Sequence, residues 1–246
     1  MESVMKSKPL KNWTPDERIS AVKGIFNTIT PHYDLLNRIM SGRRDVAWRK
    51  FAARRLPSDV NNILDLATGT GDLAIAIAEQ FPRARVTGAD FVEKMMRLAE
   101  TKTQARGLGA RIEFVAADAT SLPFRDSEFD AVTIAFGLRN IPDRLAALRE
   151  MKRVVKPGGK VITLEMTFPR NLRLRNFFRW YLNHMIPIVG GMISGNREAY
   201  TYLPDSIQDF LTPDQLGDLF DLAGFKAINK FPLTFGLTYL HEGIAE

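Results

Sequence analysis

The chain has 246 residues, no cysteine and a formal net charge of +6. Without cysteine, a disulfide scaffold, a thiolate nucleophile and a zinc or iron–sulfur site built on cysteine are excluded. The three histidines lie far from metal-ligand spacing, so no metal site is expected. Residues 1–60 contain 12 Lys and Arg against 6 Asp and Glu, so the positive excess lies in the first quarter. Such a segment suits nucleic acid, an anionic membrane surface or an acidic ligand.

Residues 1–57 predict a helical region that precedes the main sheet. The sequence Thr14-Pro15-Asp16-Glu17 is typical of a helix start, because it combines a capping hydroxyl, a proline in the first turn and acidic residues near the helix N-terminus. Pro31 and Gly42 interrupt the helical pattern, and Pro57 ends it. The N-terminal residues lack the apolar segment of a signal peptide, so a cytoplasmic location is expected.

Residues 58–166 predict a parallel sheet with helices on both faces. Short apolar runs alternate with helical segments, which indicates strands joined by crossover helices. The predicted strands are residues 63–67, 85–90, 112–115, 129–136 and 161–166, and the predicted helices are residues 72–80, 92–106 and 143–154.

The remaining residues predict an insertion and a closing pair of strands within the same single domain. Residues 167–224 are rich in Arg and aromatic side chains and predict a helical insertion rather than a linker. Residues 225–246 follow, with strands expected at 225–231 and 234–241, the last one antiparallel, and Pro232 between them. The longest uncharged run is interrupted by polar residues, proline and glycine, so it does not predict the ~20-residue apolar helix that spans a bilayer.

A glycine-containing loop carries the main cofactor signal. Asp65–Asp72, with the sequence DLATGTGD, lies where the first strand turns into a helix. Its glycines let a ligand approach the backbone, and the helix N-terminus offers free N–H groups. Asp90 follows at the end of the second strand, where a carboxylate can accept hydrogen bonds from ribose hydroxyls. Nicotinamide dehydrogenases and S-adenosylmethionine methyltransferases share this layout. Dehydrogenases prefer glycine at the position of Ala74 but tolerate alanine there, and Asp65 directly before the loop favours the methyltransferases.

Several motifs extend this signal into a family resemblance. Asp65–Asp72 resembles the first motif of class I methyltransferases, and Ala117–Ala119 resembles their adenine-contacting loop. Tyr33–Asn37 (YDLLN), Phe136–Asn140 (FGLRN) and Tyr202–Ile207 (YLPDSI) are similar to motifs of the ubiquinone/menaquinone biosynthesis C-methyltransferase family. Smaller matches to this family are Trp48–Lys50 and Leu164-Glu165, and the turn at 153–159 resembles the class I turn before the fifth strand.

The resemblance runs from about Val22 to the C-terminus and implies a fold, a cofactor and a reaction. The fold is an α/β, Rossmann-like, doubly wound and mostly parallel seven-stranded sheet with an antiparallel last strand. S-Adenosyl-L-methionine is the implied methyl donor, and a ring carbon of a polyprenylated quinol, demethylmenaquinol above all, is the implied acceptor. The residues that match cofactor-binding positions are Asp65, Gly69, Thr70, Gly71, Asp90, Asp118 and Ala119.

The resemblance also assigns residues to the substrate side, namely Arg139, Asn140, Tyr33 and Asp34 as catalytic residues and Asn37 and Tyr202 as substrate-binding residues. A guanidinium suits the stabilisation of a quinol oxyanion, since it keeps its charge and donates in a fork. A water oriented by Arg139 and Asn140, or else Asp34, would accept the proton. Plainer roles compete: Tyr33 as a packing residue, Asp34 paired with Arg38, and Arg139 in a structural ion pair.

Two stretches depart from the family pattern. Gly42–Ala47 (GRRDVA) replaces a segment that usually reads Phe-Gly followed by His-Arg, which bears on the substrate headgroup. Ala135 stands where the fourth strand usually ends in serine, which removes one polar contact on the cofactor side.

Residues 177–192, preceded by several arginines, predict a lid or a segment that rests on a membrane surface. A cover over the pocket or a homodimer interface would explain the same pattern. Because a polyprenylated quinol resides in the bilayer, we expect peripheral association with the inner face of the membrane. The alternatives are methylation of another lipid or phenol and, in a different class, a nucleic-acid-binding module; the basic quarter lacks the recognised nucleic-acid motifs, so no nucleic acid is expected.

Overall fold

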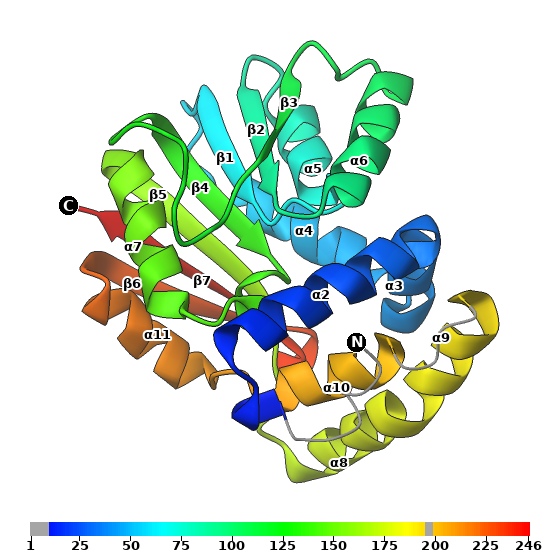
Figure 1. The fold of residues 1–246 in the computed structure, drawn as a ribbon. Helices are drawn as coiled ribbons and strands as arrows, with labels where there is room; N and C mark the ends of the chain where they lie inside the picture. Colours follow the sequence, from blue (N-terminus) through cyan, green and yellow to red (C-terminus); the bar gives the residue numbers. More distant parts are fainter. Residues whose placement is uncertain (1–9, 195–198) are drawn as a thin grey trace.

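The computed structural model describes residues 10–194 and 199–246, and a seven-stranded sheet forms its centre (Figure 1). The strand order is β3-β2-β1-β4-β5-β7-β6. The strands are β1 (Asn62–Leu66), β2 (Arg85–Asp90), β3 (Ile112–Ala116), β4 (Phe129–Ala135), β5 (Val155–Met166), β6 (Phe225–Leu233) and β7 (Thr238–Ala245). The first five strands are parallel, and β7 is antiparallel to both of its neighbours. This topology confirms the predicted fold class.

Helices cover both faces of the sheet and one of its ends. The N-terminal helices are α2 (Pro15–Ile29), α3 (Tyr33–Ser41) and α4 (Arg44–Arg54), and the crossover helices are α5 (Asp72–Gln80), α6 (Glu93–Ala105) and α7 (Arg144–Val154). The later helices are α8 (Leu172–Trp180), α9 (Ile186–Ser194), α10 (Ala199–Gln208) and α11 (Pro213–Leu222), with a π-helical turn, η4 (Tyr181–Met185), between α8 and α9. Figure 1 shows α2 and α3 together with α8–α10 beyond the same end of the sheet.

Local sequence signals explain where the N-terminal helices begin and end. Thr14 and Glu17 form a capping box, in which the Glu17 N–H donates to Thr14 Oγ1 at 3.3 Å and the Thr14 N–H donates to Glu17 Oε2 at 2.7 Å. This confirms the predicted helix start. Gly42 ends α3 with a φ of 57°, in the left-handed region that glycine adopts without strain.

Three apolar clusters hold the layers together. One face of the sheet packs against α4 and α5, for example through Trp48 and Ile77. The other face packs against α7 and α11, for example through Leu148 and Phe220. A third cluster joins α2 and α3 to α8–α10, with Leu36 almost fully buried. These helices, α2, α3 and α8–α10, form a cover that has its own apolar core beside the sheet.

The structure differs from the sequence prediction in the closing strands. Pro232 lies inside β6, opposite Tyr239 of β7, and the chain turns instead at Thr234–Gly236. Proline is tolerated there because β6 is the edge strand, where one row of N–H groups needs no partner strand. In addition, α11, which falls in the segment 167–224, packs against the sheet through Phe220.

In the part of the chain that the structure describes, no helix combines the length and the apolar character needed to cross a bilayer.

Candidate cofactor and substrate sites

Two cavities lie side by side between the cover and the ends of the strands. The apolar cavity has a volume of about 320 Å³ and is lined mainly by residues of α2, α3 and α8–α10. The second cavity, of about 250 Å³, lies at the carboxyl ends of the parallel strands and is called the sheet-edge cavity. It is lined by the loops that follow β1, β2, β3 and β4. Phe26, Tyr33 and Phe136 line both cavities and so form a shared wall. Groups bound in the two cavities would therefore meet at this wall.

Asp90 organises the sheet-edge cavity. Its Oδ2 accepts a hydrogen bond from the Gly69 N–H and its Oδ1 accepts one from the Val92 N–H, both at 2.8 Å. Burial raises the pKa of the Asp90 carboxyl, although these bonds act in the opposite direction. Each oxygen keeps further acceptor capacity. Asp90 thus fixes the glycine loop and still presents oxygens to a hydroxyl-bearing ligand.

The loop after β3 completes this cavity. Asp118 Oδ1 accepts hydrogen bonds from the N–H and the hydroxyl of Thr120, each at 2.8 Å. Asp118 and Ala119 line the cavity beside Gly69 and Asp90. The structure therefore brings four of the predicted cofactor residues together.

A small polar recess of about 20 Å³ opens beside the glycine loop and takes in Asp65, Gly69 and Thr70. Asp65 is buried and accepts hydrogen bonds from Thr68 Oγ1 at 2.7 Å and Thr133 Oγ1 at 2.8 Å. Burial raises its pKa to about 6, although both hydrogen bonds act in the opposite direction. Such a carboxyl is suited to a cationic group, which would favour its ionised form. Gly71, the residue before α5, adopts a φ of 78° that glycine tolerates without strain.

Arg139 lies in η3 (Leu138–Asn140), directly after β4, and lines the apolar cavity. Its Nη1 donates to Glu165 Oε2 at 2.9 Å and to the Phe136 carbonyl at 2.6 Å, and its backbone N–H donates to Glu165 Oε1 at 3.1 Å. Nε is buried with no hydrogen-bond partner among the described residues. The structural ion pair weighed from the sequence is thus present, and it fixes a guanidinium at the cavity.

Four other predicted substrate-side residues line the two cavities. Tyr33 and Asn37 of α3 and Tyr202 of α10 line the apolar cavity, and Asn140 lines the sheet-edge cavity. The Tyr202 hydroxyl donates to Asn140 Oδ1 at 3.0 Å. Burial raises the pKa of Tyr33 and of Tyr202, although nearby arginines act in the opposite direction. Both phenols are therefore neutral hydrogen-bonding groups at neutral pH.

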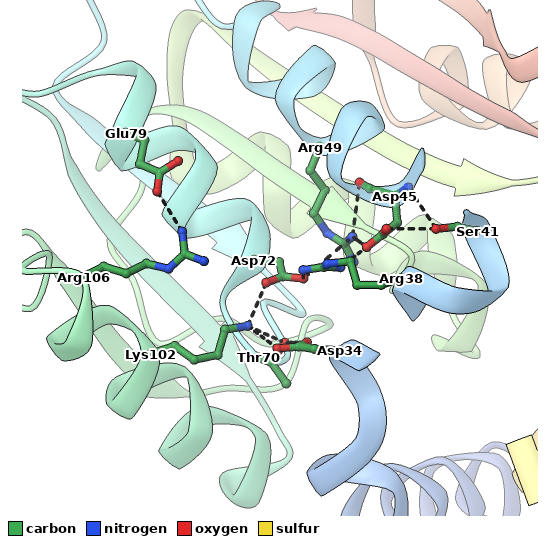
Figure 2. A network of polar contacts seen from close by, with 10 residues as sticks. All are labelled: Asp34, Arg38, Ser41, Asp45, Arg49, Thr70, Asp72, Glu79, Lys102 and Arg106. Carbon is green, nitrogen blue, oxygen red and sulfur yellow. Dashed lines mark hydrogen bonds and ion pairs between the residues drawn. The ribbon is translucent and has the colours of Figure 1, made fainter. Parts of the chain in front are cut away.

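Asp34 is placed differently from the other predicted catalytic residues. Its Oδ1 accepts a hydrogen bond from Thr70 Oγ1 at 2.6 Å, and its Oδ2 accepts one from Lys102 Nζ at 2.5 Å (Figure 2). It lines neither of the two cavities nor the recess. Arg38, the partner considered from the sequence, pairs instead with Asp45 and Asp72.

Both departures from the family pattern lie at these sites. Gly42 and Arg43 adopt left-handed conformations between α3 and α4, and Arg44 and Asp45 line the apolar cavity. Ala135 lines the sheet-edge cavity and the recess, so its missing hydroxyl would have faced the cofactor side.

Three charged residues at these sites have roles that the sequence does not predict. Glu165 lies within a quoted motif but has no local feature that reveals Arg139 as its partner. Arg49 lines both the apolar cavity and the recess. Lys102 reaches Asp34 across 68 positions of sequence, and no local pattern predicts such a contact.

The family of the chain follows from its similarity to known proteins. The model of the ubiE/COQ5 methyltransferase family matches residues 13–245. A protein of Thermus thermophilus named demethylmenaquinone methyltransferase is 46% identical over 220 residues, which cover 89% of this chain and 99% of that protein. A protein of Geotalea daltonii named ubiquinone/menaquinone biosynthesis C-methyltransferase UbiE is 40% identical over 229 residues, covering 92% and 97%.

Among solved structures, the methyltransferase in a complex with the Trm112 activator of Haloferax volcanii has a TM-score of 0.65 at 20% identity, covering 89% of this chain and 97% of that one. The [4+2]-cyclase SpnF has a TM-score of 0.66 at 23% identity, covering 88% and 76%. At these identities the structures show the shared fold alone, whereas the match over residues 13–245 shows the family. The chain belongs to the ubiE/COQ5 methyltransferase family.

Proposed function

We propose that this protein transfers a methyl group from S-adenosyl-L-methionine to a ring carbon of a polyprenylated quinol, with demethylmenaquinol as the acceptor. The observation that carries the proposal is the pair of cavities that share the wall of Phe26, Tyr33 and Phe136, with Arg139 on the apolar side. The substrate follows the name of the Thermus thermophilus relative.

The sheet-edge cavity and the recess together are the proposed site of S-adenosylmethionine. Asp90 would accept hydrogen bonds from the ribose hydroxyls, and the loop of Asp118 and Ala119 would contact the adenine. Gly69 leaves room for the ligand beside the backbone, whereas Gly71 lines none of these spaces and a side chain there would meet Ala99 and Phe114. The recess would hold the methionine end, with Asp65 facing its ammonium group and Thr70 nearby. When bound, the cofactor supplies an electrophilic methyl group on a sulfonium.

The apolar cavity would hold the quinol ring so that its nucleophilic carbon faces the shared wall. Reaction in line requires the carbon and the methyl group at about 3–3.5 Å. Ionisation of a quinol hydroxyl raises electron density at the adjacent carbon, and Arg139 would stabilise the oxyanion that forms. Asn37 and Tyr33 would orient the ring from α3.

As the carbon–carbon bond forms and the carbon–sulfur bond breaks, the ring carbon must lose its proton. We assign both protons to a water held by Arg139 and Asn140, whose amide oxygen is oriented by the Tyr202 hydroxyl. The water would take the hydroxyl proton when the quinol ionises and the ring-carbon proton after methyl transfer. One of the two protons returns to the oxyanion, so that one proton is released for each methyl group transferred. The guanidinium is a poor acceptor because it is already protonated. Asp34 lines neither cavity nor the recess, and its carboxylate is paired with Lys102, which disfavours it as the acceptor.

The exposed side of α8 and α9 is the proposed membrane-resting surface. Large apolar side chains stand in solvent there: Leu172, Phe177, Trp180, Ile188 and Met192, which are 68%, 64%, 49%, 47% and 81% exposed. Arg170, Arg173 and Arg179 lie in and beside α8, where they would face anionic headgroups. Phe177 also lines the apolar cavity, so a prenyl tail could pass from a bilayer into it.

Vesicle flotation tests this surface. The protein should float with vesicles that contain anionic lipid, whereas the variant Phe177→Ser/Trp180→Ser should stay in the dense fraction. Equal flotation of both proteins would contradict the proposal that the exposed side of α8 and α9 rests on a membrane. A homodimer formed through the same face would instead appear as a concentration-dependent mass that both substitutions abolish.

Complementation tests the proposed reaction. The gene should restore methylated quinone to a bacterial strain that accumulates its demethylated precursor, with a gain of one methyl mass in the extracted quinone. A strain that expresses the folded protein and still accumulates only the precursor would contradict the proposed acceptor and would favour another lipid or phenol.

A further inference from the structure

A network of charged side chains connects α3 of the cover to α5, α6 and the glycine loop, beside the recess (Figure 2). Lys102 of α6 lies at its centre, and its Nζ donates to Asp34 at 2.5 Å, to Asp72 at 2.7 Å and to Thr70 Oγ1 at 3.2 Å. Asp34 belongs to α3 of the cover, whereas Thr70 and Asp72 belong to the glycine loop and α5. One ammonium group therefore bridges three elements.

A second set of contacts, centred on Arg38, also joins α3 to α5 and includes α4. Arg38 of α3 donates to Asp72 Oδ2 at 2.6 Å and also pairs with Asp45, which in turn accepts from Arg49 at 2.9 Å. Burial raises the pKa of Asp72, but the charges of Arg49 and Lys102 and the hydrogen bonds of Lys102 and Arg38 outweigh it and hold the pKa at about 2. Asp72 is therefore ionised and anchors the cover at neutral pH.

This network is shielded from solvent in a way that an ordinary surface pair is not. The side chains of Lys102, Asp34 and Asp72 are 18%, 27% and 11% exposed. The Arg106–Glu79 pair connects α6 to α5 only one helical turn away, and its side chains are 53% and 44% exposed. Partly buried pairs are screened less by water and salt than exposed ones. Arg106 is thus a natural control for Lys102.

The contacts of Asp34 bear directly on the proposed reaction site. Asp34 follows Tyr33 in the first turn of α3, and Tyr33 lines both cavities and the recess. Thr70, the other partner of Asp34, lines the recess. Lys102 lines none of these three spaces. Its effect on a bound ligand must therefore pass through its partners Asp34, Thr70 and Asp72. Asp72 lines the recess as Thr70 does, and Asp34 is the partner that belongs to α3 and adjoins Tyr33.

We propose that Lys102 is a positioning residue for the methyl transfer, which acts through Asp34 to hold Tyr33 and Thr70 at the junction of the cofactor and acceptor cavities. The inference rests on the proposed function, since it takes the recess as the site of the cofactor's charged end. It assigns Asp34 to positioning rather than to proton transfer.

The test compares Lys102→Met with the control Arg106→Met. We would measure S-adenosylhomocysteine binding by calorimetry, kcat and KM for S-adenosylmethionine with demethylmenaquinol, and thermal unfolding. Loss of the charge-assisted bonds predicts that Lys102→Met weakens binding and raises KM by about tenfold, whereas Arg106→Met changes both less than about twofold. Lys102→Arg should recover most of the affinity, because it restores the charge and the donors.

A merely structural role would lower the unfolding temperature of Lys102→Met and leave binding and KM per folded molecule unchanged; that result would overturn the inference. The double variant Lys102→Met/Asp34→Asn gives a second check. If the two residues act as a pair, the double variant binds no worse than Lys102→Met. Effects that multiply would show that Lys102 acts without Asp34.

The unaltered protein separates this inference from the proposed function. If it binds no S-adenosylhomocysteine, the proposed function fails and the inference fails with it. If it binds, and Lys102→Met binds equally well, the inference alone fails.

Discussion

Replacing Glu165 by glutamine would remove the charge that faces Arg139 while keeping the shape of the side chain. The side chain of Arg139 is 6% exposed and that of Glu165 is 1% exposed, and Glu165 accepts two hydrogen bonds from Arg139. Breaking a buried pair by removing one partner costs about 3–5 kcal/mol, because the remaining charge is left uncompensated. In a domain of this size 1 kcal/mol corresponds to about 2–4 °C in Tm, so we expect Glu165→Gln to lower Tm by roughly 6–20 °C.

Denaturant and thermal unfolding followed by circular dichroism would measure this loss. The matched control is Glu93→Gln, which makes the same chemical change in an exposed pair with Arg97 at 3.6 Å and should leave the midpoint nearly unchanged. The double variant Arg139→Met/Glu165→Leu should recover much of the stability, because neither charge remains, but should not transfer methyl groups. Unfolding of Glu165→Gln at the same midpoint as the unaltered protein would refute the reasoning that this pair holds Arg139 at the cavity.

Three further predictions concern ligand binding and turnover. Asp90→Ala should abolish S-adenosylhomocysteine binding in calorimetry, because it removes both the proposed ribose contact and the bond to the Gly69 N–H; retained affinity would contradict the assignment. Arg139→Ala should lower kcat in a methyl-transfer assay while cofactor binding remains, and loss of cofactor binding would contradict its substrate-side role. Because the raised pKa of Asp65, about 6, leaves this carboxyl neutral below that pH, the affinity of the unaltered protein for S-adenosylhomocysteine should fall about tenfold per pH unit below 6. Asp65→Asn should remove this pH dependence, and a variant with the same pH dependence would show that another group titrates.

The positions of the strands and of most helices can be predicted from the sequence. Each depends on a signal within a short stretch of residues, such as a strand or helix periodicity or the capping box at Thr14. Pro232 shows where local reasoning fails. Proline within a run argues for a break in the strand, but the position of β6 at the sheet edge, which depends on the whole topology, permits it.

The same distinction applies to the site. The glycine loop and Asp90 could be placed from sequence, since the carboxyl ends of parallel strands meet at one edge of the sheet. The partners of Asp34 and Arg139 could not, because Lys102 and Glu165 join them across 68 and 26 positions of the chain. The alternative pairing of Asp34 with Arg38 has the right helical spacing, but Arg38 pairs with Asp72 and Asp45.

The most direct test of the account is methyl transfer by the purified protein in anionic vesicles that contain demethylmenaquinol, with S-adenosylmethionine labelled in its methyl group. The account predicts one labelled methyl group on a ring carbon of each quinol converted, with one S-adenosylhomocysteine released. Label on a quinol oxygen, or cofactor binding without transfer of label to the quinol, would contradict it.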